Sequence, residues 1–339
     1  MIIPRLSHFV RCPRHRLRLA LHLSLLLLSC LAGRNVFATG DYPDHPIQMI
    51  VPFSAGGPAD IVGRLYAKHL SELLGQPVVI QNRDGAGGII GTEVAAHAAA
   101  DGYTIVFGTT STMAINQIIM KNLRYDFFRD FELVGLIANA PHVLAVRADF
   151  PAKTVPEFIT LAKQNPGKYT FATSGVGTIV QMGGELLKYT AGIDIMHVPF
   201  KGGGPATLAL LAGQVDITVN DMTTLKTNIA SGKLRPLAVA DKERLKLLPS
   251  IPTFAELGLP KMISSTWWGI AVPKATPADI QAKLQAANNK IIVDPDYIAH
   301  LTGLAVQPLT LTPKETSDFI ASEIQKWKTV ADVANIHVD

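Results

Sequence analysis

Short apolar segments typical of buried strands alternate with helical segments along most of this 339-residue chain. Each strand-like segment is followed by a loop of small residues, and most of these loops lead into a helical pattern. In the first half, strands are predicted at residues 47–52, 78–82 and 104–108, and helices at 60–74 and 89–99. A repeated order of strand, loop and helix predicts parallel βαβ units with right-handed crossovers. The expected fold class is therefore α/β.

The same order restarts in the second half of the chain, after a helical segment at residues 156–165. We interpret this half as a second α/β domain of the same design. In open parallel sheets, the loops beyond the carboxyl ends of the strands gather at one edge, where ligands bind. The strands are predicted at 169–172, 197–200, 215–219 and 234–240, and the helices at 178–190 and 205–212.

Two long extended segments, at residues 133–147 and 266–273, bracket the second half and are predicted to be crossover strands between the domains. The helices predicted at 277–293 and 313–334 would then return to the first domain. About 300 residues fit two domains of ~150 residues each. The predicted boundaries are 39–142 and 265–339 for domain 1, and 143–264 for domain 2.

Residues 1–38 have the composition of a secretory signal peptide, with six Arg, no Lys and no acidic residue. The apolar run behind the arginines is too short to cross a bilayer, which takes ~20 residues. Val36 and Ala38 fit the small-residue exit of such a peptide, so the mature chain is predicted to begin at Thr39. An uncleaved anchor and lipidation at Cys30 stay open as alternatives.

The charge of the predicted mature chain excludes one class of protein. This part holds 25 basic and 27 acidic residues, so the basic balance of the whole sequence comes from the leader. A basic nucleic-acid binder is therefore excluded. Both cysteines, Cys12 and Cys30, lie in the leader, so no disulfide is expected. No later stretch reaches 18 apolar residues, and export of a soluble chain predicts the periplasm of a Gram-negative bacterium.

The common catalytic and cofactor motifs are missing from the sequence. There is no His-Glu-x-x-His helix, no Gly-x-Ser-x-Gly elbow, and no Gly-Lys pair followed by Ser or Thr. Residues 85–91 come near the dinucleotide fingerprint, but their third glycine stands one residue late. The chain is therefore predicted to be no enzyme and to use no cofactor.

Small-residue loops at the predicted strand ends are the main candidates for a ligand site. Glycine lets backbone N–H groups turn toward a ligand, and hydroxyl groups add further donors. Several loops open helices, whose first N–H groups lack partners and hold a carboxylate or phosphate without any Arg. The candidate residues in these loops are Ser54, Ala55, Gly56, Gly57, Gly85, Ala86, Gly87, Gly88, Thr109, Thr110, Ser111, Ser174, Gly175, Gly177, Thr178, Lys201 and Gly202.

Each of these loops taken alone has a plainer interpretation, because glycine is also common in tight turns. Five such loops on the same edge of two domains favour a ligand cleft instead. Asp60 follows the first loop and is predicted mainly to cap or begin the first helix and to pair with Arg64 on the same face. It is also a candidate ligand contact.

Three histidines and a pair of tryptophans have structural interpretations. His97, His142 and His197 lie far apart with no ligand spacing between them, so no metal site is predicted. Trp267 and Trp268 stand on the second extended segment and are interpreted as packing at the hinge rather than as a stacking platform.

Several distinctive segments occur in order from residue 41 to the end of the chain. They are residues 42–60, 79–82, 85–88, 101–104, 197–202, 213–216, 249–258 and 267–269, followed by Pro273 and Pro277. In this combination the chain resembles the substrate-binding proteins of tripartite tricarboxylate transporters, the Bug-type receptors abundant in Bordetella and related bacteria.

This resemblance implies a type II periplasmic-binding-protein fold, with two α/β domains, two crossover strands and a ligand between the domains. It also implies a small carboxylate ligand held largely by backbone N–H groups, hydroxyl groups and water. Residues 54–57 and 85–88 would meet the ligand from the first domain. Residues 174–178 and the segment Phe200, Lys201 and Gly202 would meet it from the second.

The chain departs from the family pattern at three positions near the implied site. Gln181 stands where a histidine often opens the second-domain helix. Phe200 replaces the usual tyrosine, and Ser54 stands where proline is common. Each difference bears on specificity, so the sequence names no particular ligand.

The predicted function is that of a periplasmic solute receptor that binds a small carboxylate without catalysis. We expect a monomer that closes on its ligand. The resemblance implies that it delivers the ligand to the membrane subunits of a tripartite tricarboxylate-type transporter. Two alternatives stay open. The receptor would present the bound solute to a signalling ectodomain, or the chain would be a secreted α/β hydrolase or transferase, for which no motif supplies a nucleophile and a base.

Overall fold

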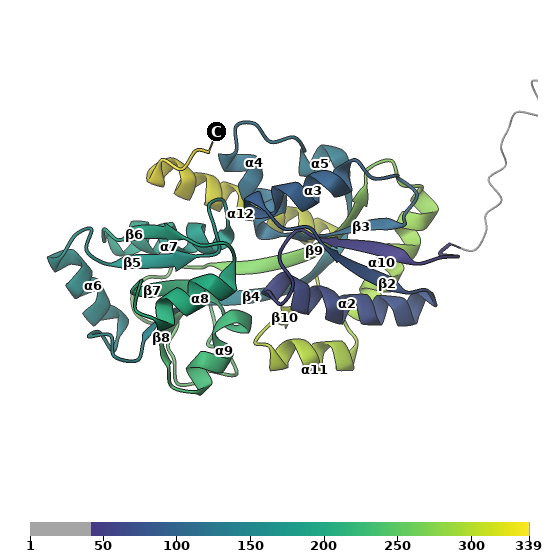
Figure 1. Ribbon diagram of the computed structural model, residues 1–339. Coiled ribbons are helices and arrows are strands. Elements are labelled where there is room, and N and C mark those ends of the chain that lie inside the picture. Colours follow the sequence, from purple (N-terminus) through teal and green to yellow (C-terminus); the bar gives the residue numbers. More distant parts are fainter. Residues whose placement is uncertain (1–41, 339) are drawn as a thin grey trace, which may run out of the picture. The chain divides into compact units, whose positions relative to one another are not determined.

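The computed structural model describes residues 42–338, and one mixed sheet forms the centre of this part (Figure 1). Its strands follow the order β2-β1-β3-β9-β4-β7-β5-β6, with β8 and β10 also paired to β4. The strands are β1 (Ile47–Val51), β2 (Val78–Asn82), β3 (Thr104–Thr109), β4 (Phe131–Arg147), β5 (Thr170–Thr173), β6 (Met196–Pro199), β7 (Ile217–Asp221), β8 (Leu234–Val239), β9 (Ser265–Pro273) and β10 (Gln307–Pro308).

The pairing separates two parallel groups of strands. β1 pairs in parallel with β2 and β3, and β5 pairs in parallel with β6 and β7. β9 and β4 are antiparallel to their neighbours and lie between the two groups, as Figure 1 shows. This arrangement agrees with the predicted α/β fold and with the prediction of two long crossover strands.

Helices connect the strands and begin where the local sequence predicts a start. α2 has Pro58 at its first position and ends before Gly75, whose φ of 71° suits glycine. α12 begins with a capping box between Thr312 and Glu315. The helices are α2 (Pro58–Leu74), α3 (Ile89–Ala96), α4 (Asn116–Ile119), α5 (Phe127–Asp130), α6 (Val155–Gln164), α7 (Ile179–Ala191), α8 (Gly203–Leu211), α9 (Met222–Ala230), α10 (Ala278–Ile291), α11 (Pro295–Gly303) and α12 (Pro313–Ala334), with a 3-10 turn at Ala86–Gly88 and a π turn at Ser111–Ile115.

Strand β4 takes part in both groups of strands. Its residues up to Pro141 pair with β9, and its residues from His142 onward pair with β7. The N–H of His142 donates to the carbonyl of Ser264, the residue before β9 (2.9 Å). Both chain crossings between the groups therefore lie side by side at this point.

The two faces of β9 have different neighbours, because side chains alternate along a strand. On one face, the Trp267 indole donates to the Glu323 carboxylate of α12 (3.1 Å). The same carboxylate accepts a hydrogen bond from the Trp327 indole (3.0 Å). Thr266 and Trp268 point to the opposite face, toward the cavity described below. Glu323 thus joins α12 to β9 on the face of the strand that points away from the cavity.

The sequence of residues 42–338 forms no helix that is both long and apolar enough to cross a bilayer. The signal peptide predicted for residues 1–38 lies outside the described residues, and so does its predicted cleavage after Ala38.

Candidate functional site

A cavity of about 240 Å³ lies where the loops of the two strand groups meet. Ligand pockets for drug-sized molecules measure ~300–1,000 Å³, so this one suits a smaller solute. The lining residues are Phe53, Ser54, Ala55, Gly56, Gly57, Pro58, Ala59, Thr109, Ser111, Ser174, Thr178, Ile179, Val180, Lys201, Gly202, Gly203, Gly204, Pro205, Asn220, Asp221, Thr224, Thr266 and Trp268. Ten of the predicted ligand contacts are among them: Ser54, Ala55, Gly56, Gly57, Thr109, Ser111, Ser174, Thr178, Lys201 and Gly202.

Three helices begin at this cavity. Helix α2 starts after Gly57, α7 after Thr178 and α8 after Gly202, and all three of these residues line the cavity. None of the three caps its helix with a side-chain hydrogen bond, as far as residues 42–338 are concerned. The first N–H groups of each helix carry positive partial charge. The cavity is therefore electrostatically suited to an anion.

The glycines of the first loop have different conformations. Gly56 has a φ of 79°, in the left-handed region that favours glycine. Gly57 has a φ of −81° and a ψ of 171°, an extended conformation that any residue adopts. The turn at Gly56 thus requires glycine. At Gly57 the backbone does not require glycine, but any other residue would place its side chain at the cavity.

Nine predicted contacts do not line the cavity, and Asp60 among them bonds to a residue that does. Asp60 is 4% exposed, and its carboxylate accepts hydrogen bonds from the N–H of Gly56 (2.9 Å) and from Arg64 and Asn82. Burial alone would raise the pKa of Asp60. The hydrogen bond from Arg64, followed by those from Gly56 and Asn82, outweighs burial and lowers this pKa below its usual value. The nine residues are Asp60, Gly85, Ala86, Gly87, Gly88, Thr110, Gly175, Gly177 and Phe200.

The predicted glycine loop at residues 85–88 packs against Val176 and Gly177 of the second-domain loop, and none of these residues lines the cavity. A Cβ atom added to Gly87 would lie 3.0 Å from the carbonyl oxygen of Val176 and 3.8 Å from backbone atoms of Gly177. A Cβ atom on Gly88 would lie 2.6 Å from the Thr112 side chain. Glycine permits close approach to protein atoms as readily as to a ligand, and the neighbour of Gly87 is backbone.

Thr110 and Phe200 likewise have internal partners. The Thr110 hydroxyl accepts from the Trp267 N–H (2.8 Å) and lies 3.2 Å from the carbonyl of the same residue, so it ties β3 to β9. The Phe200 backbone bonds to Thr173 and Gly202, and its half-buried ring packs against the core under α8 and α9.

The sequence alone did not predict six polar or aromatic lining residues, Asn220, Asp221, Thr224, Thr266, Trp268 and Phe53. The end of β7 carries the first two, and the rule that ligands bind beyond strand ends could have found them. The two residues on β9 required knowledge of which face of the crossover strand turns toward the cavity.

Two of these residues shape the chemistry of the cavity. The Trp268 side chain is fully buried, and its indole N–H has no hydrogen-bond partner within residues 42–338. Burial raises the pKa of Asp221, against hydrogen bonds from Thr223 and Thr224 that lower it. A buried donor and a buried acid therefore stand in one cavity with the exposed Lys201.

Residues 62–336 match the family described as Tripartite tricarboxylate transporter family receptor. The chain belongs to this family of periplasmic solute-binding receptors. One relative is Protein BugT of Bordetella pertussis, which is 37% identical over 290 residues, with 85% of this chain and 89% of BugT covered. The predicted resemblance to Bug-type receptors is thus confirmed.

Solved structures of receptors of this type match the fold closely. Rpa4515 of R. palustris with adipate has a TM-score of 0.83 and 32% sequence identity, with 88% of this chain and 99% of that chain covered. MatC of Rhodopseudomonas palustris with bound malate has a TM-score of 0.78 and 32% identity, with 85% and 99% covered. These matches confirm the predicted type II periplasmic-binding-protein fold.

Behind the cavity wall of this receptor lies a buried histidine at the crossing point of the strands. The His142 ring nitrogens lie 3.0 Å from the Thr266 hydroxyl and 2.9 Å from the Ser264 hydroxyl. The ring is fully buried, and burial, followed by the nearby Lys326 charge, lowers the pKa of His142 to about 3. His142 therefore stays neutral in the folded receptor at neutral and mildly acidic pH.

We expect the receptor to lose stability in acid partly through His142. The unfolded chain takes up a proton near pH 6.5, while the folded chain does so only near pH 3. This contribution is fully present above pH 6.5 and is lost as the pH falls toward 3, by about 1.4 kcal/mol per pH unit. Urea unfolding measures the fall in the free energy of unfolding from pH 7 to pH 5. This fall should be about 2 kcal/mol smaller in His142→Gln than in the wild type. An identical loss in both proteins would contradict this prediction.

Proposed function

We propose that this receptor captures a small carboxylate in the cavity between its two groups of strands, and that it performs no catalysis. The observation that carries the proposal is the convergence of α2, α7 and α8, each with its amino-terminal end at the cavity. A helix amino terminus offers backbone N–H groups and a positive potential, both of which suit a carboxylate. Rpa4515 with adipate and MatC with malate support a carboxylate as the class of ligand.

The proposed binding mode uses the lining residues according to their chemistry. The N–H groups at the starts of the three helices, together with the Ser54 and Ser174 hydroxyl groups, would hold a carboxylate. The Trp268 indole would donate a further hydrogen bond, because a buried N–H without a partner costs about 1–3 kcal/mol. Asp221 would face a hydroxyl or other donor on the ligand, since it repels a second carboxylate.

Closure of two domains around the ligand is part of the proposal. We assign residues 39–142 and 265–339 to one domain and 143–264 to the other. The Ile179 N–H of α7 donates to the Ser111 hydroxyl across the cavity (3.0 Å). A Cβ atom on Gly202 would lie 3.8 Å from the Ser54 hydroxyl. The hydrogen bond between Ile179 and Ser111 joins the two proposed domains directly, as expected of a closed receptor.

The proposed partner is the membrane part of a tripartite tricarboxylate-type transporter, in keeping with the family description. We propose that the receptor reaches the periplasm after cleavage behind Ala38. Sequencing of the secreted protein from its amino terminus should then begin at Thr39.

A thermal-shift screen of the mature protein tests the proposed function. Dicarboxylates and tricarboxylates, adipate and malate included, would be compared with their uncharged amides as matched controls. A ligand present at 100 times its Kd stabilises the native state by about 2.7 kcal/mol, which is several degrees in Tm. At least one carboxylate should raise Tm while its amide does not. A screen in which no carboxylate acts, or in which the amides act equally, would contradict the proposal.

Replacing Lys201, the one lysine among the described residues that line the cavity, should weaken ligand binding only modestly. Lys201 is exposed, so its charge is screened by solvent, and the backbone N–H groups remain in the variant. We expect Lys201→Ala to raise the Kd by less than about tenfold, as for the loss of one hydrogen bond of 0.5–1.5 kcal/mol. Calorimetry with the best ligand from the screen measures this effect, with Lys246→Ala as the control for net charge. A loss above a hundredfold would make Lys201 the main anchor.

A further inference from the structure

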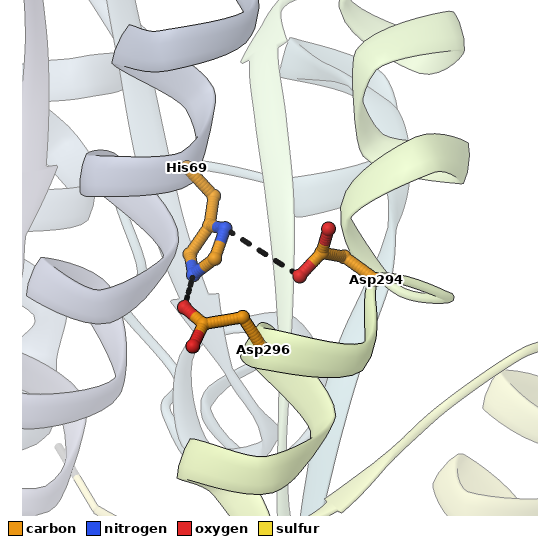
Figure 2. Close-up of side chains that lie close together, drawn as sticks. All are labelled: His69, Asp294 and Asp296. Carbon is orange, nitrogen blue, oxygen red and sulfur yellow. Dashed lines mark ion pairs between the residues drawn. The ribbon is translucent and has the colours of Figure 1, made fainter.

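Outside the cavity, one histidine and two aspartates come together between α2 and α11, as Figure 2 shows. His69 lies on α2, Asp294 is the residue before α11, and Asp296 is on its first turn. One possible ligand atom from each of the three lies within 4.8 Å of the other two. His69 is more than 220 positions away from the two aspartates in sequence, so no local spacing indicates this cluster.

The His69 ring is buried, yet one of its nitrogens has no hydrogen bond to any described residue. The side chain is 8% exposed, and its Nε2 atom has no hydrogen-bond partner among the described residues. Nε2 lies 3.5 Å from an Asp296 carboxylate oxygen, which is too long for a hydrogen bond. Tyr297 packs edge-on against the ring, with 5.4 Å between ring centres, and helps to fix its orientation. The buried Nε2 atom thus faces the Asp296 carboxylate without a hydrogen bond to it, while Nδ1 lies 3.9 Å from the Asp294 oxygen that caps α11.

The two carboxylates are accessible and have coordinating capacity. The side chains of Asp294 and Asp296 are 42% and 58% exposed. One Asp294 oxygen accepts the Tyr297 N–H as the cap of α11 (3.0 Å). A carboxylate that caps a helix with one oxygen still offers the other to an ion. Solvent can reach this side of the cluster, so an ion has a path of entry and water can complete its coordination.

We propose that His69, Asp294 and Asp296 form a binding site for a divalent transition-metal ion such as Zn²⁺. Imidazole and carboxylate together are a donor set that suits Zn²⁺, with metal–ligand distances of ~2.0–2.2 Å. Two ligands at those distances on a tetrahedral ion are about 3.3–3.5 Å apart. The separation of 3.5 Å between His69 Nε2 and the Asp296 oxygen matches this value. The ion would satisfy the unpaired nitrogen and clamp α2 to α11.

This site is separate from the proposed carboxylate cavity. His69 stands eleven residues after Pro58 on α2, which corresponds to about 16 Å along the helix from its start at the cavity. Metal binding and carboxylate binding can therefore succeed or fail independently.

Calorimetric titration of the tag-free mature receptor with Zn²⁺ tests the proposal. We expect one site, together with a rise in Tm on adding Zn²⁺. His69→Asn and Asp296→Asn should each weaken binding at least tenfold. Asp294→Asn should do the same while keeping the helix cap, because asparagine caps as well as aspartate. Asp44→Asn, which alters the exposed pair of Asp44 and His45, should leave the affinity unchanged.

Two results would overturn the proposal. The first is the lack of any Zn²⁺ binding by the wild-type receptor. The second is unchanged affinity in both His69→Asn and Asp294→Asn. That result would assign the ion to the exposed Asp296 and His300, whose side chains lie 3.5 Å apart on one face of α11. Should His69→Asn fail to fold, as judged by circular dichroism, the exposed Asp294 variant decides the question alone.

Discussion

Replacing Gly57 with valine should weaken carboxylate binding about a hundredfold or more while the fold survives. Gly57 lines the cavity at the start of α2, and the added carbons would stand where a carboxylate meets the first N–H groups. Loss of two charge-assisted hydrogen bonds of ~1.5–3 kcal/mol each accounts for this size of effect. The extended φ of −81° accepts valine, and a Cβ atom would meet only the Ser54 carbonyl at 3.4 Å. Calorimetry measures the affinity, and thermal unfolding measures the fold.

Gly303→Val is the matched control for this change. Gly303 ends α11, and a Cβ atom there would have nothing within 4 Å. It does not line the cavity, so the control variant should bind like the wild type. If Gly57→Val folds and still binds within a few-fold of the wild type, the loop is only a turn and the ligand lies elsewhere.

Replacing Glu323 with alanine should lower the free energy of unfolding by about 3–5 kcal/mol, more than any other substitution proposed for this receptor. Its carboxylate is 8% exposed and accepts hydrogen bonds from the indoles of Trp267 and Trp327 and from the Lys326 ammonium. Alanine would leave two buried indole donors without an acceptor, at about 1–3 kcal/mol each. Urea unfolding measures the change. Binding should also weaken, because Glu323 holds the strand that carries Thr266 and Trp268.

Glu315→Ala on the same helix controls for the loss of a glutamate from α12. Glu315 is exposed and belongs only to the capping box, so its replacement should cost much less than that of Glu323. Equal effects of the two changes would contradict the bridging role of Glu323.

The alternation of strands and helices could be predicted from the sequence because each βα unit has a clear local signal. α6 was expected at residues 156–165 and is found at Val155–Gln164. α11 was missed, although Asp294 followed by Pro295 is a typical helix start. α9 was also missed, and its three threonines give its sequence a weak helix propensity.

The candidate site was predictable only in part, because it combines local and long-range features. Gly57 and Gly202 precede helices, and that local pattern suffices to place N–H groups at a strand end. The same pattern at Gly87 produces close backbone packing, and sequence alone does not distinguish the two uses of glycine. Trp268 was interpreted as hinge packing, and its ring is indeed buried on a crossover strand, but it also lines the cavity. The pairing of β9 with β3 and β4 determines this position.

The crystal structure of the receptor with the best carboxylate from the screen tests the central proposal most directly. We expect a ligand carboxylate in the cavity, with oxygens about 2.7–3.2 Å from backbone nitrogens at the starts of α2, α7 or α8. The Trp268 indole nitrogen should lie within the same distance of a ligand oxygen. A carboxylate bound outside the cavity, or held in it mainly by the Lys201 ammonium, would contradict the proposal.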